Sequence, residues 1–345
     1  MSDQTTTSDA PKTSFLTKIK GLSQKAKLII AAGVVVLLGG GTAFAYAAIQ
    51  SPENTVGLAI ASAFTGSHPS GNLDIKAEGA ALSGDASLDI FNSDTGVALK
   101  LKVAATLAGQ PVGATLNVVS AKSGDLYLNL DEYSTLASYL QNSGMVPSAA
   151  VAAYETVLNG VWIKVTKTDI DQLTGGGNGS GCLSGKLDDS AYTKALSGEL
   201  QTALRGNLFI VPTKELPGVN GDRVFTLGIS AEKLKGFLKA VRGTKYYADL
   251  QTCVPGFEIT DAQINDITQA KIDEAAKQSG IVVTLYAKGG WSPKMDKLVI
   301  EGGSAMTEKI TATYTPGGDQ SNKVVIPTQS KTVQELMNSL LTAPY

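Results

Sequence analysis

Hydrophobic and polar residues alternate along much of the chain beyond residue 70. In residues 73–78 every second side chain is apolar and the intervening ones are charged. The same alternation recurs in residues 85–90, 97–103, 126–130 and 161–165. Successive side chains of a β-strand point to opposite faces, so the pattern predicts strands with one buried and one solvent-facing side. Turn sequences at residues 94–96 and 123–125 favour an antiparallel meander.

Other segments place apolar residues at the spacing of an amphipathic helix. These are residues 53–64, 133–140, 147–158 and 333–341, a helix that follows Ser230 and ends at Gly243, and a longer one from Thr260 to Gly280. Ser230 is a predicted N-cap, and Thr260 with Gln263 has the pattern of a capping box. Further strands are predicted at residues 209–211, 224–229, 281–287, 295–300 and 308–314. Strands on both sides of the helices predict one large α+β domain, an antiparallel sheet with helices against one face.

Residues 28–49 form an uncharged, mainly apolar stretch. As a helix rising about 1.5 Å per residue it would be about 33 Å long, enough to span a hydrocarbon core of about 30 Å. Residues 1–27 carry five lysines against two aspartates. The positive-inside rule therefore predicts a single-pass signal-anchor in the cytoplasmic membrane, with the N-terminus inside and the C-terminal part outside. A cleaved signal peptide is the alternative, because residues 43–47 are rich in alanine, as signal-peptide cleavage sites are. The protein would then be secreted after cleavage near residue 47.

The predicted domain organisation follows from these segments. Residues 1–27 are a disordered basic cytosolic tail, residues 28–49 a transmembrane helix and residues 50–71 a juxtamembrane helix and linker. Residues 72–345 form the extracytoplasmic α+β domain, which carries a Gly-rich insert at residues 174–190.

Charge and composition narrow the function classes. The chain has 29 Lys and Arg against 31 Asp and Glu, a balance that argues against nucleic acid as a partner, since such proteins neutralise phosphates with a basic surface. A single histidine and two cysteines exclude His-clustered and four-cysteine metal sites. We therefore expect no metal and no cofactor.

The two cysteines, Cys182 and Cys253, lie in turn-rich sequence outside the predicted membrane segment. An even number of cysteines in an extracytoplasmic domain favours one disulfide bond. Closing a loop of about 70 residues would contribute on the order of 4 kcal/mol to stability. Two separate thiols are the alternative.

Candidate catalytic motifs are incomplete. The Gly-rich residues 175–181 precede Gly185 and Lys186, but Leu187 stands where a phosphate-binding loop needs Ser or Thr. Ser230 and Lys233 spell Ser-x-x-Lys without the companion motifs of that nucleophile, so a helix cap is the better interpretation. Carboxylate pairs occur at residues 131/132, 169/171 and 188/189. They lack the spacing of a calcium-binding loop, so we interpret them as turn residues. We interpret His68 as a loop residue. We therefore assign no catalytic residue and expect no enzyme.

Trp162 has the opposite strand parity to Ile163. Trp162 either packs in the core on the second side of the sheet or lines a pocket, and core packing is the favoured interpretation.

Several short sequence segments together resemble those of one protein superfamily. They are the opening helix at residues 53–64 and the predicted strand segments at residues 70–75, 124–130, 159–165 and 324–327. In these the chain resembles the extracytoplasmic lipid and lipoprotein carriers, a superfamily that includes the LolA/LolB carriers and the mycobacterial LppX-like lipoproteins. The resemblance implies a curved antiparallel sheet, a half-barrel with helices packed in its mouth around an apolar cavity for acyl chains. The chain departs from the family in its predicted membrane helix, which replaces a lipidated cysteine, and in its Gly-rich insert with two cysteines.

From the pattern and the resemblance we expect a membrane-anchored extracytoplasmic binding protein, for a lipid, a lipoprotein or another apolar ligand held between sheet and helices. The alternative is a structural or interaction ectodomain of the cell envelope, in which the protein's own helices fill the apolar face. Ligand-binding residues cannot be named individually, because cavity-lining and helix-packing positions share the same parity on each strand.

Overall fold

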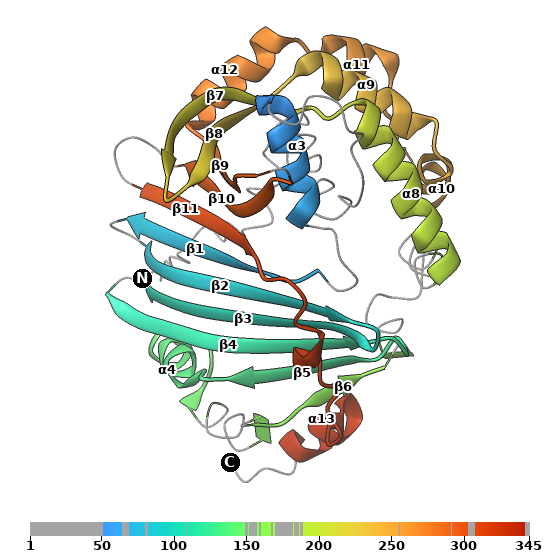
Figure 1. Ribbon diagram of the computed structural model, residues 1–345. Helices are drawn as coiled ribbons and strands as arrows, with labels where there is room; N and C mark the ends of the chain where they lie inside the picture. The colour runs from blue at the N-terminus through green and yellow to red at the C-terminus, as the bar shows by residue number, and fades with distance from the viewer. Residues whose placement is uncertain are drawn as a thin grey trace, which may run out of the picture. The chain divides into compact units, whose positions relative to one another are not determined.

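The alternating segments pair into one large sheet (Figure 1). The computed structural model describes residues 51–63, 69–79, 82–107, 109–148, 151, 157–158, 160–166, 168–169, 182, 186, 189–254, 256–290, 292–302 and 308–341. Within these, the sheet has twelve strands in the order β12-β6-β5-β4-β3-β2-β1-β11-β10-β9-β8-β7.

The strands are β1 (Gly71–Gly79), β2 (Leu82–Ser93), β3 (Gly96–Leu107), β4 (Gln110–Ala121), β5 (Leu126–Asp131), β6 (Ile163–Val165), β7 (Ile210–Val219), β8 (Asp222–Ile229), β9 (Val282–Lys288), β10 (Lys294–Gly302), β11 (Glu308–Pro316) and β12 (Lys331–Thr332). The main helices are α3 (Pro52–Ala63), α4 (Ser134–Asn142), α8 (Ser190–Gly206), α9 (Ala231–Arg242), α10 (Lys245–Cys253), α11 (Asp261–Asp266), α12 (Gln269–Ser279) and α13 (Val333–Leu341), with the short 3-10 helix η1 (Ser321–Lys323).

The expected half-barrel is wrong, because the sheet is open and mixed. It ends at two edge strands, β12 and β7. All neighbouring strands are antiparallel except β12, which runs parallel to β6. The parallel pair arises because β12 follows a crossover from β11, which lies on the other side of β1. Such a long-range crossover leaves no mark in the local alternation that predicted the meander.

The helices are not confined to one face, which is a second correction. The predicted opening helix is present as α3, which contacts β7, β9 and β10 (Figure 1). The predicted helix at residues 133–140 is present as α4, which packs on β4. The Oγ1 atom of Thr135 in α4 donates to the carbonyl oxygen of Gly113, on the strand face that also carries Thr115 and is opposite to the face under α3.

The structure gives the predicted transmembrane helix no support. Among the described residues, none of the helices is both long and apolar enough to cross a membrane. The segment 28–49, with the alternative cleavage position near residue 47, lies outside the described residues, as do most of the predicted helix at 147–158 and most of the Gly-rich insert.

Helix boundaries follow local capping chemistry. Ser230 caps α9 by accepting from the backbone N–H of Lys233, and Thr260 forms the predicted capping box with Gln263. The single long helix predicted after Thr260 is wrong: Ile267 is extended, and Thr268 caps a second helix, α12. The sequence interpretation missed α8 and α10.

Candidate apolar binding surface

A continuous row of apolar side chains crosses the sheet on one face. Cross-strand pairing aligns Leu130, Leu116, Leu101, Leu88, Leu73, Tyr314, Leu298, Leu285 and Phe225. A second row on the same face consists of Ala114, Val103, Ala86, Ile75, Ala312, Ile300, Val283 and Leu227. The predicted two-sided strands are therefore confirmed, and their apolar sides form one surface.

Helix α3 covers the part of this face that is formed by the strands nearest to the edge strand β7. Phe225 and Leu285 are fully buried there, as are Val56 and Ala59 of α3. The Arg223 guanidinium, on the same strand face as Phe225, donates to Oγ1 of Thr55 at 2.7 Å. Arg223 also pairs with Glu215 through Nε and Nη2, at 2.8 and 3.0 Å. This pairing holds the pKa of Glu215 below its ordinary value, and the same guanidinium is held beside α3 by its hydrogen bond to Thr55.

Over β1 to β4 the same rows remain partly accessible. We call this part the central apolar surface; it consists of Leu73, Ile75, Leu88, Ile90, Leu99, Leu101, Leu116 and Val118, all half-buried. The described helices with extensive contacts to these strands, α4 and η1, lie on the opposite face. The contrast between the buried end under α3 and the accessible centre marks the central apolar surface as the candidate site.

Tyr314 places one hydroxyl within the apolar row. Its ring lies against the backbone of Gly71, where a Cβ atom would come within 2.6 Å of the tyrosine Cε2. Burial raises the pKa of the Tyr314 phenol. The group therefore stays neutral at physiological pH and can act as a hydrogen-bonding group at the margin of an apolar ligand.

The other face of these strands has a polar part and an apolar part. Asp74, Lys76, Glu78, Asp85, Lys100 and Lys102 are exposed on it. It also carries a second apolar cluster, built from Ala98, Val119, Tyr127 and Val324 with Trp162 packed against it. Core packing of Trp162 on the second side of the sheet is thereby confirmed.

The carboxylates considered for chemistry are held by local partners. Glu132 accepts from Thr115 Oγ1 at 2.8 Å and pairs with Lys102 at 3.4 Å. Asp131 accepts from Asn117, Asp169 from Thr166, and Asp189 caps α8. Among the described residues, no group of three or more His, Cys, Asp or Glu side chains is arranged to hold a metal ion. His68, Asp171 and Asp188 lie outside the described residues.

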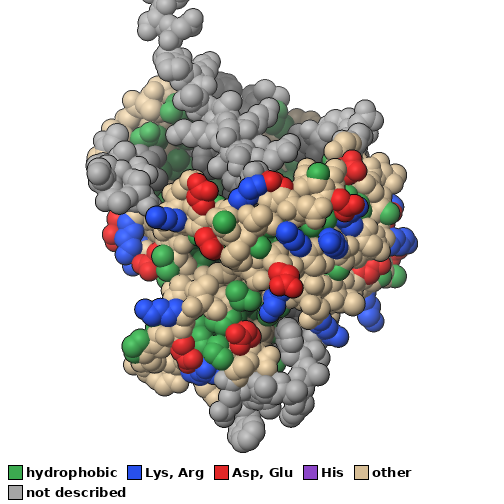
Figure 2. Space-filling view, turned by 90° about the horizontal axis from the view of Figure 1, so that it is seen from above, with side chains coloured by type: hydrophobic (Ala, Val, Ile, Leu, Met, Phe, Trp, Pro, Cys, Tyr) green, Lys and Arg blue, Asp and Glu red, His purple; other side chains and the backbone are tan. Residues whose placement is uncertain are grey.

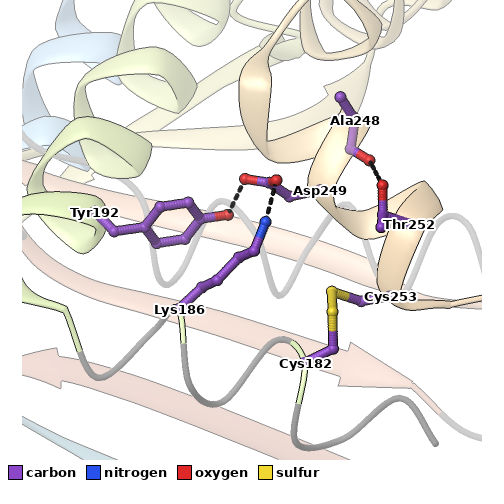
Figure 3. The surroundings of a disulfide bond; sticks show 7 residues. All are labelled: Cys182, Lys186, Tyr192, Ala248, Asp249, Thr252 and Cys253. Carbon is purple, nitrogen blue, oxygen red and sulfur yellow. Dashed lines mark hydrogen bonds and ion pairs between the residues drawn. A yellow bond between two sulfur atoms is a disulfide. The ribbon is translucent and has the colours of Figure 1, made fainter.

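The predicted disulfide is present between Cys182 and Cys253 and ties the Gly-rich insert to α10 (Figure 3). A second tether lies beside it. Asp249 of α10 pairs with the Lys186 ammonium and accepts from the Tyr192 hydroxyl at 2.9 Å. Burial and the hydrogen bond to Asp249 raise the pKa of Tyr192 to about 12, so its hydroxyl remains a donor at physiological pH.

Two open grooves run along α8. The larger, of about 580 Å³, is lined mainly by small residues such as Gly198, Ala203 and Gly243. The smaller, of about 270 Å³, is lined by Tyr192, Glu199 and Lys245 among others. Acidic and basic side chains are interspersed over the described surface seen in Figure 2. The larger groove has Glu199 as the one charged residue of its lining, and the smaller has both acidic and basic residues. We assign neither groove a ligand.

Comparison with protein-family models gives no match, and comparison with curated proteins gives no significant match. The candidate site therefore rests on the geometry of this chain. The strand parity in the sequence identified which residues share the apolar face. It could not identify which of them α3 buries, because that depends on the order of strands in the sheet.

Proposed function

We propose that this protein binds a lipid, or another ligand with a long apolar chain, on the central apolar surface. The observation that carries the proposal is the uneven covering of one apolar row. Its members under α3 are fully buried, whereas Leu73, Leu88 and Leu101 in the same row stay accessible. Apolar area that remains in contact with water favours an apolar ligand by about 25 cal/mol per Å² buried.

Two further features support an extracytoplasmic lipid-binding role. The disulfide bond is of the kind that persists in oxidising compartments outside the cytoplasm. One of the sequence segments that resemble the lipid and lipoprotein carriers, residues 70–75, contributes directly to the site, since Leu73 and Ile75 of the central apolar surface lie within it. We propose membership of that superfamily on these grounds, with an open sheet in place of the half-barrel.

The first test asks whether the purified full-length protein carries a ligand. We expect organic extraction followed by mass spectrometry to recover a molecule with a long apolar chain in roughly stoichiometric amount. We also expect the delipidated protein to bind the fluorescent fatty acid cis-parinaric acid in a saturable manner. Repeated absence of both would overturn the proposal in favour of a structural or interaction domain.

The second test localises binding. The double variant Leu88→Gln/Leu101→Gln places two amides on the central apolar surface, where an apolar chain cannot satisfy them. We expect its affinity for cis-parinaric acid to fall about tenfold or more, corresponding to at least about 1.4 kcal/mol. The matched control Val219→Gln/Val325→Gln changes two exposed valines outside the surface, 48% and 66% accessible, and should bind as the wild type does. Circular dichroism verifies that both variants fold; equal binding by the two would contradict the assignment.

A further inference from the structure

The side chain of Tyr314 lies at the boundary between the covered and the accessible parts of the apolar face. Its strand, β11, runs between β10, which α3 contacts, and β1, which carries part of the central apolar surface (Figure 1). Tyr314 pairs with Leu298 on one side and with Leu73 on the other. Its hydroxyl is therefore a polar group in a row of side chains that otherwise consist of hydrocarbon.

The position of this hydroxyl depends on Gly71. A Cβ atom at position 71 would lie 2.6 Å from Cε2 of Tyr314 and 2.7 Å from its hydroxyl oxygen. The outer edge of the ring thus lies against the backbone of Gly71, in space that the side chain of any other residue would fill. Gly71 pairs with Ile90 of the central apolar surface. The hydroxyl consequently lies over β1, next to the strand that carries Ile90.

The strands around Tyr314 direct their lysines away from it. Among the described residues of β1 to β4 and β11, those on the apolar face include no lysine and no arginine. The lysines of these strands lie on the opposite face; they are Lys76, Lys100, Lys102 and Lys309. Arg223 shares the apolar face, but its guanidinium is bonded to Glu215 and Thr55 beside α3.

This distribution of charge favours an uncharged polar group beside Tyr314. A carboxylate or phosphate placed there would lose part of its hydration without gaining an ion pair, which is costly. An uncharged oxygen loses less hydration, and one hydrogen bond can replace what it loses. A tyrosine hydroxyl supplies such a bond, because its hydrogen rotates about the C–O bond to meet an acceptor. Burial raises the pKa of this phenol, so it keeps the hydrogen at physiological pH.

We propose that the Tyr314 hydroxyl binds the polar end of the ligand, an uncharged oxygen such as an ester carbonyl at the start of an apolar chain. The inference rests on the proposed function. It adds a specificity-determining residue and the chemical class of the ligand's polar end. The central apolar surface, which begins beside this hydroxyl, accommodates the chain.

Three fluorescent probes separate hydrogen bonding from apolar burial. Methyl cis-parinarate has an ester carbonyl, cis-parinaric acid is an ionised carboxylate at mildly alkaline pH, and diphenylhexatriene has no oxygen. Titration of the delipidated full-length protein gives a dissociation constant for each. The test variant is Tyr314→Phe, which removes only the hydroxyl. Tyr286→Phe is the matched control, because Tyr286 is also half-buried but lies on the opposite face of the sheet from Leu285.

We expect Tyr314→Phe to bind methyl cis-parinarate about three- to tenfold more weakly than the wild type, the effect of one lost hydrogen bond. Its affinity for diphenylhexatriene should stay within about twofold of the wild-type value, which a general loss of folding would not allow. Tyr286→Phe should bind both probes as the wild type does. Gly71→Ala keeps the hydroxyl but displaces the ring, so it should also weaken ester binding selectively.

An unchanged ester affinity in Tyr314→Phe, or equal weakening of both probes, overturns the inference. Unchanged ester binding by Gly71→Ala overturns the placement of the hydroxyl over β1. Tighter binding of the ionised acid than of the ester by the wild type also overturns the inference, because a cation would then hold the polar end. A wild type that binds diphenylhexatriene but gives any of these results keeps the proposed function, whereas a wild type that binds none of the probes loses it.

Discussion

At the scale of single residues, Gly71 and Tyr314 show how the apolar row is assembled. The tyrosine ring occupies the space that a side chain at position 71 would need, with 2.6 Å between the added Cβ and Cε2. We expect Gly71→Ala to lower the free energy of unfolding by about 1 kcal/mol, the low end of overpacking costs, because the ring can turn aside. Urea denaturation measures this. Gly198→Ala on α8, where nothing lies within 4 Å, should instead stabilise by about 0.5–1 kcal/mol.

Asp249 gives a pH-dependent prediction at the same scale. The Lys186 ammonium and the Tyr192 hydroxyl hold the pKa of this carboxyl below its ordinary value. Its stabilising contribution is therefore complete above the unfolded-state pKa of about 4 and is lost as the pH falls through the lower folded-state value. We expect Asp249→Asn to lower the melting temperature at pH 7 and to match the wild type in strong acid. An equal difference at both pH values, measured by circular dichroism, would contradict this assignment.

At the scale of elements, the disulfide ties the insert to α10. It closes a separation of 71 residues. We expect the double variant Cys182→Ser/Cys253→Ser to lose about 4 kcal/mol of unfolding free energy, since the unfolded chain regains its loop freedom. Denaturation of the wild type with and without reductant should reproduce the loss, and the variant should be insensitive to reductant. A reductant effect in the variant would contradict the interpretation.

Local chemistry explains which elements could be predicted. Ser230 and Thr260 cap helices with their own hydroxyls, so the sequence alone locates those helix starts. The break at Ile267 and Thr268 was missed because the apolar stripe continues across it, and only the geometry shows that Thr268 caps a new helix. Asp189 caps helix α8. This aspartate is a helix-start signal in the sequence, but we interpreted it as a turn residue.

At the scale of the whole molecule, ligand occupancy should govern stability. A ligand that binds only the folded state at a hundred times its dissociation constant adds about 2.7 kcal/mol. We therefore expect lysophosphatidylcholine, below its micellar concentration, to raise the melting temperature of the delipidated wild type. The Leu88→Gln/Leu101→Gln variant should show a smaller shift, and the Val219→Gln/Val325→Gln control the full one. No shift in the wild type would argue against a lipid ligand.

The sequence by itself determined the strands, their two-sided character and several helix starts, because side-chain alternation and capping are local properties of a few neighbouring residues. It also singled out Cys182 and Cys253, since two cysteines allow one pairing. Only the tertiary structure decided that the sheet is open, that β12 pairs in parallel with β6, and that α3 covers one end of the apolar face and leaves the centre accessible. These features bring together residues that are far apart in the chain. The strand order is selected by the packing free energy between distant segments, and the local alternation of side chains contains no information about that packing.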